Sequence, residues 1–119
     1  MIVSDFLVDD FKKIQEFVSK KHNLAVIRAL LSSVQGIGFN ALLKITQPIT
    51  PRILSLRLKD LEKQKIIQKN LVLGMRPKIE YRLLPKGEKL KKTLIELEKW
   101  GKQELWFILS PKVLILKKQ

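Results

Sequence analysis

One stretch of side chains, from Ile49 to Gln64, combines a regular apolar stripe with a basic and hydroxyl-bearing opposite side. Leu54, Leu58 and Leu61 recur at i, i+4 and i+7, which predicts one buried helical face. The other face carries Arg52, Ser55, Leu56, Lys59 and Lys63. Arginine can donate two hydrogen bonds to guanine, a hydroxyl bonds adaptably, and leucine can touch a thymine methyl. The pattern therefore suits a helix in a DNA major groove, and an ordinary surface helix with solvated lysines is the alternative.

The start of this helix and the element before it place it in a known arrangement. Thr50 is expected to be the N-cap and Pro51 the first helical residue, where a missing N–H costs nothing. A shorter helix is predicted over 39–46, and Gln47-Pro48 ends it because the residue before proline leaves the α region. Two short helices joined by about three residues make a helix-turn-helix over 39–64.

Two strands follow, predicted over 66–73 and 79–84 from alternating apolar and polar residues. The turn-rich segment 74–77 joins them as a hairpin. Arg76 and Lys78 at its tip are expected to reach phosphates or the minor groove, and a solvated hairpin is the alternative. The fold class that follows is α+β and mainly helical: a winged helix-turn-helix with a two-stranded wing over 66–84. Segment 35–38 is expected to be a turn.

Charge is concentrated in the same part of the chain. The sequence has 119 residues, 45% of them hydrophobic, which fits one domain with a real core. Its net charge is +13, of which +9 lies in residues 50–92. This concentration of positive charge predicts a polyanionic partner, namely double-stranded DNA. A membrane surface is the competing partner, but the middle segment has one aromatic residue, Tyr81, and no apolar run is long enough to span a bilayer.

The residues needed for catalysis or metal binding are scarce. The chain has no cysteine and one histidine, His22, which is expected to be a helix-start or surface residue. Neither a nucleophile–base pair nor a metal cluster can be assembled, so we expect no enzyme activity, no cofactor and no metal. No signal peptide is visible, and the location expected is the cytoplasm of a prokaryote, with the protein associated with the nucleoid.

The predicted terminal helices are apolar on a wide face. The first, over 1–21, carries Phe6, Phe11 and Phe17, which could pack in the core or against a partner subunit. A buried helix follows over 24–33. The last helix is predicted from Pro85 to about Leu109, with Leu94 and Trp100 on its apolar stripe and Trp106 near the chain end. Large aromatic groups near a chain end favour a subunit interface.

Together these blocks resemble the HxlR-type winged-helix regulators, relatives of the MarR group. The resemblance covers roughly residues 22–101 and rests on F-N-A-L at 39–42, I-T-P-R-I-L-S-L-R-L-K-D-L-E at 49–62, P-K-I-E-Y-R-L at 77–83, P-K-G at 85–87 and L-E-K-W-G at 97–101. It implies a homodimer joined through helices 1–21 and 86–110, with both recognition helices on a pseudo-palindromic site. The chain would then be a single domain over 1–119.

Carried over by position, the resemblance implies contacts to bases or nearby phosphates, flanking contacts and wing contacts. The contacts to bases or nearby phosphates would come from Thr50, Pro51, Arg52, Ser55 and Leu56. The flanking contacts would come from Arg57 and Lys59, and the wing contacts from Arg76 and Lys78. Arg57 lies nearer the leucine stripe than Arg52, so an ion pair and a phosphate clamp are both open for it. The chain departs from the pattern at Gly38, where a basic residue is usual, at Leu84, where threonine is common, and in having no sensing cysteine.

The function expected is a sequence-specific transcriptional regulator, acting as a repressor. An architectural chromatin protein of the same fold is one alternative, since the charge alone would support it. A winged-helix module that binds an acidic protein is another. The sequence identifies no operator and no small-molecule effector.

Overall fold

The predicted winged helix-turn-helix is present in the first of two units of the chain. The computed structural model describes the backbone of residues 2–105 and the side chains of residues 9–105. Its units are Met1–Glu88 and Lys89–Gln119, and each is described by itself. In chain order the elements are α1 (Ile2–Ser19), α2 (Asn23–Leu31), β1 (Ile37–Gly38), α3 (Phe39–Ile45), α4 (Pro51–Lys63), β2 (Ile67–Val72), β3 (Lys78–Leu83), α5 (Pro85–Glu88) and α6 (Leu90–Glu104).

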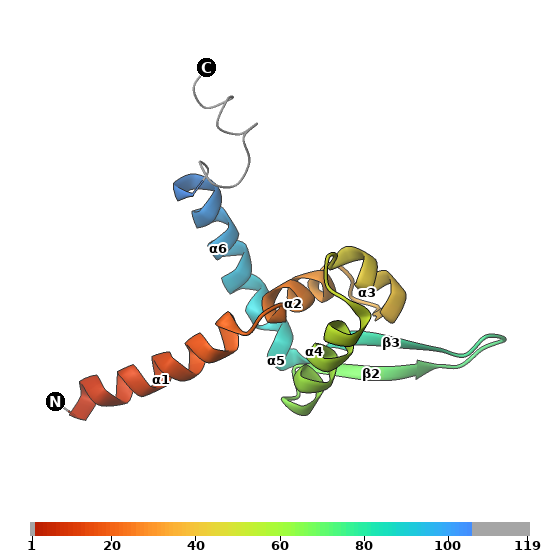
Figure 1. The fold of residues 1–119 in the computed structure, drawn as a ribbon, viewed down its shortest axis with the longest axis horizontal. Helices are drawn as coiled ribbons and strands as arrows, with labels where there is room; N and C mark the ends of the chain where they lie inside the picture. Colours follow the sequence, from red (N-terminus) through yellow and green to blue (C-terminus); the bar gives the residue numbers. More distant parts are fainter. Residues whose placement is uncertain (1, 106–119) are drawn as a thin grey trace, which may run out of the picture. The chain divides into compact units, whose positions relative to one another are not determined.

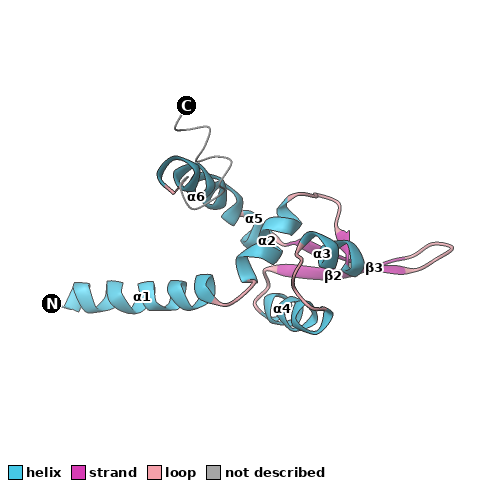
Figure 2. Cartoon of the chain, turned by 45° about the horizontal axis from the view of Figure 1, so that its top comes forward, coloured by secondary structure: helices cyan, strands magenta, loops and turns pink. Residues whose placement is uncertain are grey.

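The core of the first unit lies between α2, α3, α4 and one end of the sheet (Figures 1 and 2). Each element contributes its apolar residues at the spacing of its own period. The buried side chains include Val26, Ile27 and Leu30 of α2, Leu42 of α3, Leu54, Leu58 and Leu61 of α4, and Ile67, Tyr81 and Leu83 of the sheet. The leucine stripe predicted for α4 is thereby confirmed, and the helix's opposite face is left for other contacts.

The sheet has three antiparallel strands in the order β1-β3-β2, one more than the sequence predicted. Ile37 and Gly38 were expected in a turn, but they form β1 and pair with Tyr81 and Glu80 of β3. Two residues are too few to show an alternating pattern, so only the pairing with β3 reveals the strand. Gly36, with φ of +115°, makes the turn that leads into it.

The end of α4 turns the chain into the wing. Lys65 has φ of +62°, and the amides of Lys65 and Ile66 donate to the carbonyls of Glu62 and Leu61. This is the Schellman arrangement, in which a left-handed residue after the helix lets the last carbonyls find donors. Ile66 and Leu61 are both buried, which adds the apolar contact usual for this motif.

The last predicted helix is interrupted, and in this respect the sequence prediction was wrong. The structure has α5 over Pro85–Glu88 and α6 over Leu90–Glu104, and the boundary between the two units falls between Glu88 and Lys89. The amides of Gly87 and Glu88 both donate to the carbonyl of Leu84, whose own amide donates to Ile66. This first turn is therefore tied to the start of β2. Residues 106–109 lie outside the described part.

Candidate nucleic-acid interface

Helix α4 begins as the sequence predicted. Thr50 is its N-cap with an extended backbone, and the Thr50 Oγ1 accepts a hydrogen bond from the amide of Ile53 at 3.3 Å. Pro51 occupies the first helical position. Both residues stabilise the start of the helix, which is the end that enters a major groove in helix-turn-helix proteins.

The face of α4 opposite the leucine stripe is open to solvent. Arg52, Leu56 and Lys59 are exposed, and Ser55 is half-buried at the edge of this face. We call these four residues the recognition face. The structure thus places together a guanidinium, an ammonium, a hydroxyl and an apolar group, which are the side-chain types that read base edges.

Arg57 lies on a different flank of α4 and has a partner within the chain. Its Nη2 lies 3.1 Å from the Asp60 Oδ2, and the Arg57 side chain is only 15% exposed. Lys20 of the α1–α2 junction also donates to the Asp60 Oδ2, at 2.9 Å. The hydrogen bond from Lys20, assisted by the charges of Lys20, Arg57 and Lys63, holds the pKa of the Asp60 carboxyl below its usual range. Arg57 therefore forms the ion pair that the sequence left as one of two alternatives.

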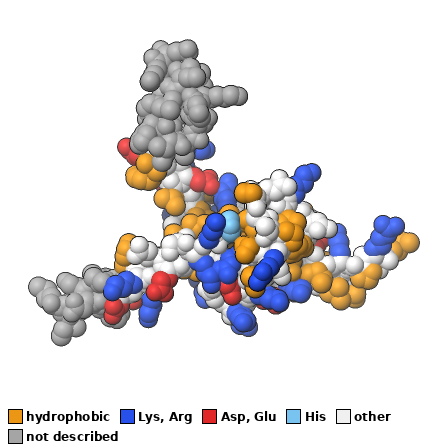
Figure 3. All heavy atoms as spheres, in the orientation of Figure 1, with side chains coloured by type: hydrophobic (Ala, Val, Ile, Leu, Met, Phe, Trp, Pro, Cys, Tyr) orange, Lys and Arg blue, Asp and Glu red, His pale blue; other side chains and the backbone are white. Residues whose placement is uncertain are grey.

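A recess beside α4 adds cationic groups that the sequence analysis had not assigned to the interface. It is lined by Lys20, Lys21, His22, Ile53 and Arg57. Figure 3 shows several Lys and Arg side chains over the middle of the face that it draws. His22 precedes α2 as its N-cap residue, with φ of +75°, which confirms the helix-start position predicted for it. The Lys20-Lys21 pair was visible in the sequence, but nothing in it placed these residues next to α4.

The wing carries its predicted cations at or near the tip. Arg76 and Lys78 are exposed, and the Lys78 Nζ lies 3.1 Å from the Glu80 Oε1. Arg82, farther from the tip, donates two hydrogen bonds to the Gln68 Oε1, at 3.2 and 3.1 Å. Lys78 and Arg82 are thus held on one face of the hairpin, since residues 78, 80 and 82 point to the same side of β3.

The residues predicted for a subunit interface are only partly described. Phe11 on α1 is exposed and Phe17 is half-buried, and Ile14 and Val18 extend the exposed apolar stripe of that helix. On α6, Trp100 is exposed and Leu94 is buried. The side chain of Phe6 and all of Trp106 lie outside the described residues. Both helices thus carry apolar side chains in contact with water in the single chain.

Neither a metal cluster nor a membrane span is found in the described part of the chain. No group of three or more His, Asp or Glu side chains there could hold an ion. No helix within residues 2–105 is both long and apolar enough to cross a bilayer.

Comparison with known proteins gives consistent results. Residues 17–107 match the family described as HxlR-like helix-turn-helix. The chain is similar to YdeP, an HTH-type transcriptional regulator of Bacillus subtilis, with 32% identity over 65 residues, which are 55% of this chain and 51% of YdeP. It thus spans about half the length of this relative. It is also similar to YvaP, another HTH-type regulator of B. subtilis, with 30% identity over 91 residues, 76% of this chain and 82% of YvaP.

Among solved structures, the fold is similar to that of the transcriptional regulator YodB from B. subtilis in its reduced form. The TM-score is 0.70, and the match covers 80% of this chain and 91% of YodB. The sequence identity is 23%, so this likeness describes the fold alone.

Proposed function

Because the chain belongs to the HxlR-like helix-turn-helix family, we propose that it is a sequence-specific, double-stranded-DNA-binding transcriptional regulator that acts as a homodimer. The family and fold are those of helix-turn-helix transcriptional regulators, which are not enzymes. The observation that carries the proposal is the recognition face of α4, which is exposed on a helix fixed to the core by three buried leucines.

Binding would proceed by electrostatic attraction followed by base readout. The excess charge of residues 50–92 attracts the phosphates and releases counterions. Arg52 then donates to guanine, Ser55 bonds to a neighbouring base or phosphate, and Leu56 touches a thymine methyl. Thr50, Pro51 and Lys59 are proposed to lie against adjacent phosphates. Arg57 is proposed to act mainly through Asp60, which positions α4 against the α1–α2 junction.

The dimer is proposed from the exposed apolar stripes of α1 and α6. Covering Phe11, Ile14 and Trp100 removes large apolar groups from water, which is the usual driving force of subunit association. A two-fold dimer would set two recognition helices one helical turn apart, about 34–36 Å, on a pseudo-palindromic site. Sedimentation of the wild-type protein should give twice the chain mass, and Ile14→Lys should lower that mass. A monomeric wild type would contradict the dimer.

Base readout by Arg52 is tested by comparing two kinds of DNA. Fragments selected from the source genome serve as specific DNA, and shuffled fragments serve as non-specific DNA. Arg52→Ala should weaken specific binding by roughly 5- to 150-fold and change non-specific binding little, since a good base contact is worth ~1–3 kcal/mol. Lys63→Ala is the matched control, because it removes the same charge from the far end of the same helix. Its loss should be small and equal on both DNAs.

The two alternative functions correspond to defined outcomes. Wild-type protein that prefers selected fragments by less than ~10³-fold at physiological salt would be an architectural DNA-coating protein instead. A protein that neither binds heparin nor shifts DNA at low salt would support a module for acidic protein partners.

Repression is proposed because a dimer that covers a promoter excludes polymerase. Expression of a reporter, compared in cells with and without the gene for this protein, checks it. The location proposed is the prokaryotic cytoplasm, on the nucleoid.

A further inference from the structure

An apolar strip continues along the wing beyond the end of the core. Cα partners across the hairpin share a face, and one face carries Ile67 opposite Leu83, then Lys69 opposite Tyr81, then Leu71 opposite Ile79. Ile67, Leu83 and Tyr81 are buried under the helices. Farther out, Leu71 is 63% exposed and Ile79 is 43% exposed. The face that forms the core at one end is therefore open to water at the other.

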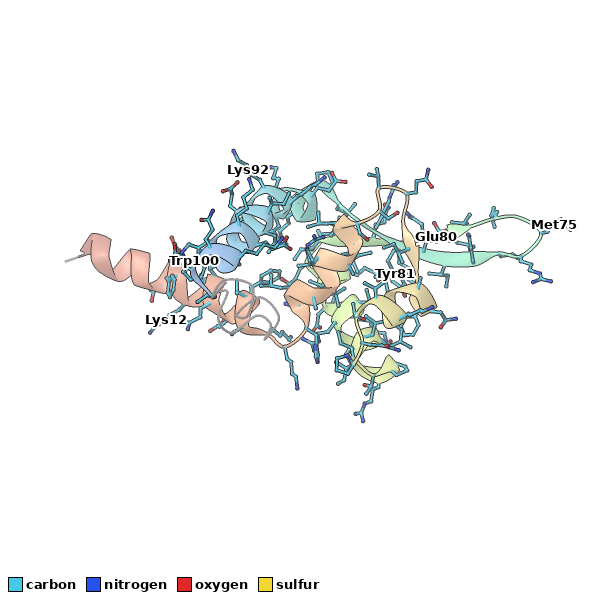
Figure 4. The ribbon with its side chains drawn as sticks, turned by 90° about the horizontal axis from the view of Figure 1, so that it is seen from above. Lys12, Met75, Glu80, Tyr81, Lys92 and Trp100 are labelled. Carbon is cyan, nitrogen blue, oxygen red and sulfur yellow. The ribbon has the colours of Figure 1, made fainter. Side chains whose placement is uncertain are left out.

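The strip ends in a loop with two more exposed apolar side chains. Leu73 is 78% exposed and Met75 is 103% exposed, so the Met75 thioether has no cover at all. Figure 4 shows Met75 at the far end of the hairpin, well beyond Tyr81. We call Leu71, Leu73, Met75 and Ile79 the wing strip. Neighbouring exposed apolar side chains on an edge strand invite association, and such a patch usually marks a binding surface.

The charges on the hairpin indicate which partner covers the wing strip. Within residues 67–83 there are four cations, Lys69, Arg76, Lys78 and Arg82, and one acid, Glu80. Pairing with the same hairpin of a second copy would bring eight cations together. Duplex DNA offers the complementary combination, because its groove walls carry phosphates and its stacked base pairs have apolar faces that a wedge reaches by unstacking one step.

We infer that the wing tip inserts Met75 between two base pairs in the minor groove and so bends the DNA. This inference rests on the proposed function, which it extends from recognition to deformation. Arg76 and Lys78 hold the phosphates on either side, while Leu73 covers the sugar edge behind the inserted side chain. Apolar wedges of this kind unstack one step and kink the duplex by about 20–90°. Pyrimidine–purine steps are the easiest to unstack, so the wing is expected to select them at a position that the recognition face does not read.

The experiment measures bending and unstacking with the full-length protein on a fragment that it binds. End-labelled duplexes report the bend by energy transfer, and permanganate reports unstacked thymines. The wild type should bend the duplex and expose a thymine next to the wing. Met75→Ala should lose most of both signals while its affinity for DNA changes by less than ~10-fold. The affinity changes little because the free energy gained by inserting Met75 is about equal to the free energy that unstacking one base step costs.

Two further variants separate the wedge from other effects. Val34→Ala removes another highly exposed apolar group, 87% exposed, from a loop outside the wing and should leave the bend unchanged. Arg76→Ala should reduce the slope of log affinity against log salt by about 1 and keep the permanganate signal.

Four outcomes would overturn the inference. Tight, sequence-specific binding without a bend would reject the wedge and leave the proposed function intact. An unchanged bend with Met75→Ala would do the same. If the wild type forms assemblies larger than a dimer that Met75→Ala dissolves, the wing strip binds a second copy instead. Failure of the wild type to bind any DNA would reject the proposed function together with the wedge.

Discussion

Replacing Gly87 by alanine is expected to have two opposing effects on the free energy of unfolding, and the two effects differ in size. It lies within α5, where replacing glycine by alanine ordinarily favours the helix by about 0.5–1 kcal/mol. The space around it predicts the opposite result. A Cβ atom at Gly87 would lie 2.7 Å from the Ile66 carbonyl oxygen, 2.8 Å from the Leu83 Cδ2 and 3.0 Å from the Ile66 Cγ2. Two of these three atoms belong to Ile66, and one of those two, the carbonyl oxygen, is a backbone atom.

The steric effect should exceed the gain in helix propensity. Relieving the contact at Gly87 requires α5 to move away from the start of β2 by roughly 0.7 Å, the difference between 2.7 Å and ordinary contact at 3.4 Å. That shift strains the hydrogen bond from the Leu84 amide to the Ile66 carbonyl, which is 2.9 Å long. Overpacking a tight site costs about 1–3 kcal/mol. The net expectation for Gly87→Ala is a loss of about 1–2 kcal/mol in the free energy of unfolding.

Urea unfolding followed by circular dichroism measures this loss, at one fixed protomer concentration because association shifts apparent stability. Gly101→Ala is the matched control, since it lies in α6 and a Cβ there would meet nothing within 4 Å. It should raise the free energy of unfolding by about 0.5–1 kcal/mol. If Gly87→Ala proved as stable as Gly101→Ala, the close approach of α5 to the sheet would not be what requires glycine at this position.

Two further substitutions test local features of α4. Lys65→Gly should raise the free energy of unfolding by about 1 kcal/mol in the same urea assay, because the left-handed φ of +62° suits glycine; a loss of stability would contradict the Schellman ending. Asp60→Asn should lower stability at pH 7 by ~0.2–1 kcal/mol, since its partners Lys20 and Arg57 are partly exposed. Because folding lowers the pKa of Asp60, the advantage of the wild type exists above the ordinary value of 3.8 and fades as the pH falls through the folded-state pKa. A difference that grew in acid would refute this.

Much of the interface could be predicted from local pattern alone. The start of α4 at Thr50 and Pro51, its buried leucine stripe and its exposed opposite face all depend on residues whose nearest neighbours in the pattern are at most four positions away. The hairpin was predictable for the same reason, because strand alternation has a period of two. Local rules also described the breaks at His22 and Gln47-Pro48. These features follow from backbone sterics and side-chain period, which a sequence displays directly.

Other features depended on contacts between residues far apart in the chain. The two-residue strand β1 exists only because it pairs with β3, and Leu84, directly before α5, donates its amide to the distant carbonyl of Ile66. Lys20 meets Asp60 across 40 residues, so no spacing rule could pair these two residues or bring the Lys20–His22 segment beside α4. The Arg57–Asp60 pair, by contrast, joins residues three positions apart on one helix, a spacing that brings side chains together. The sequence by itself determined how α4 begins and which of its faces is buried, and on that basis α4 is the helix proposed to read DNA. Only the tertiary structure decided which charges far apart in the chain are partnered, because such pairs depend on distances that folding creates.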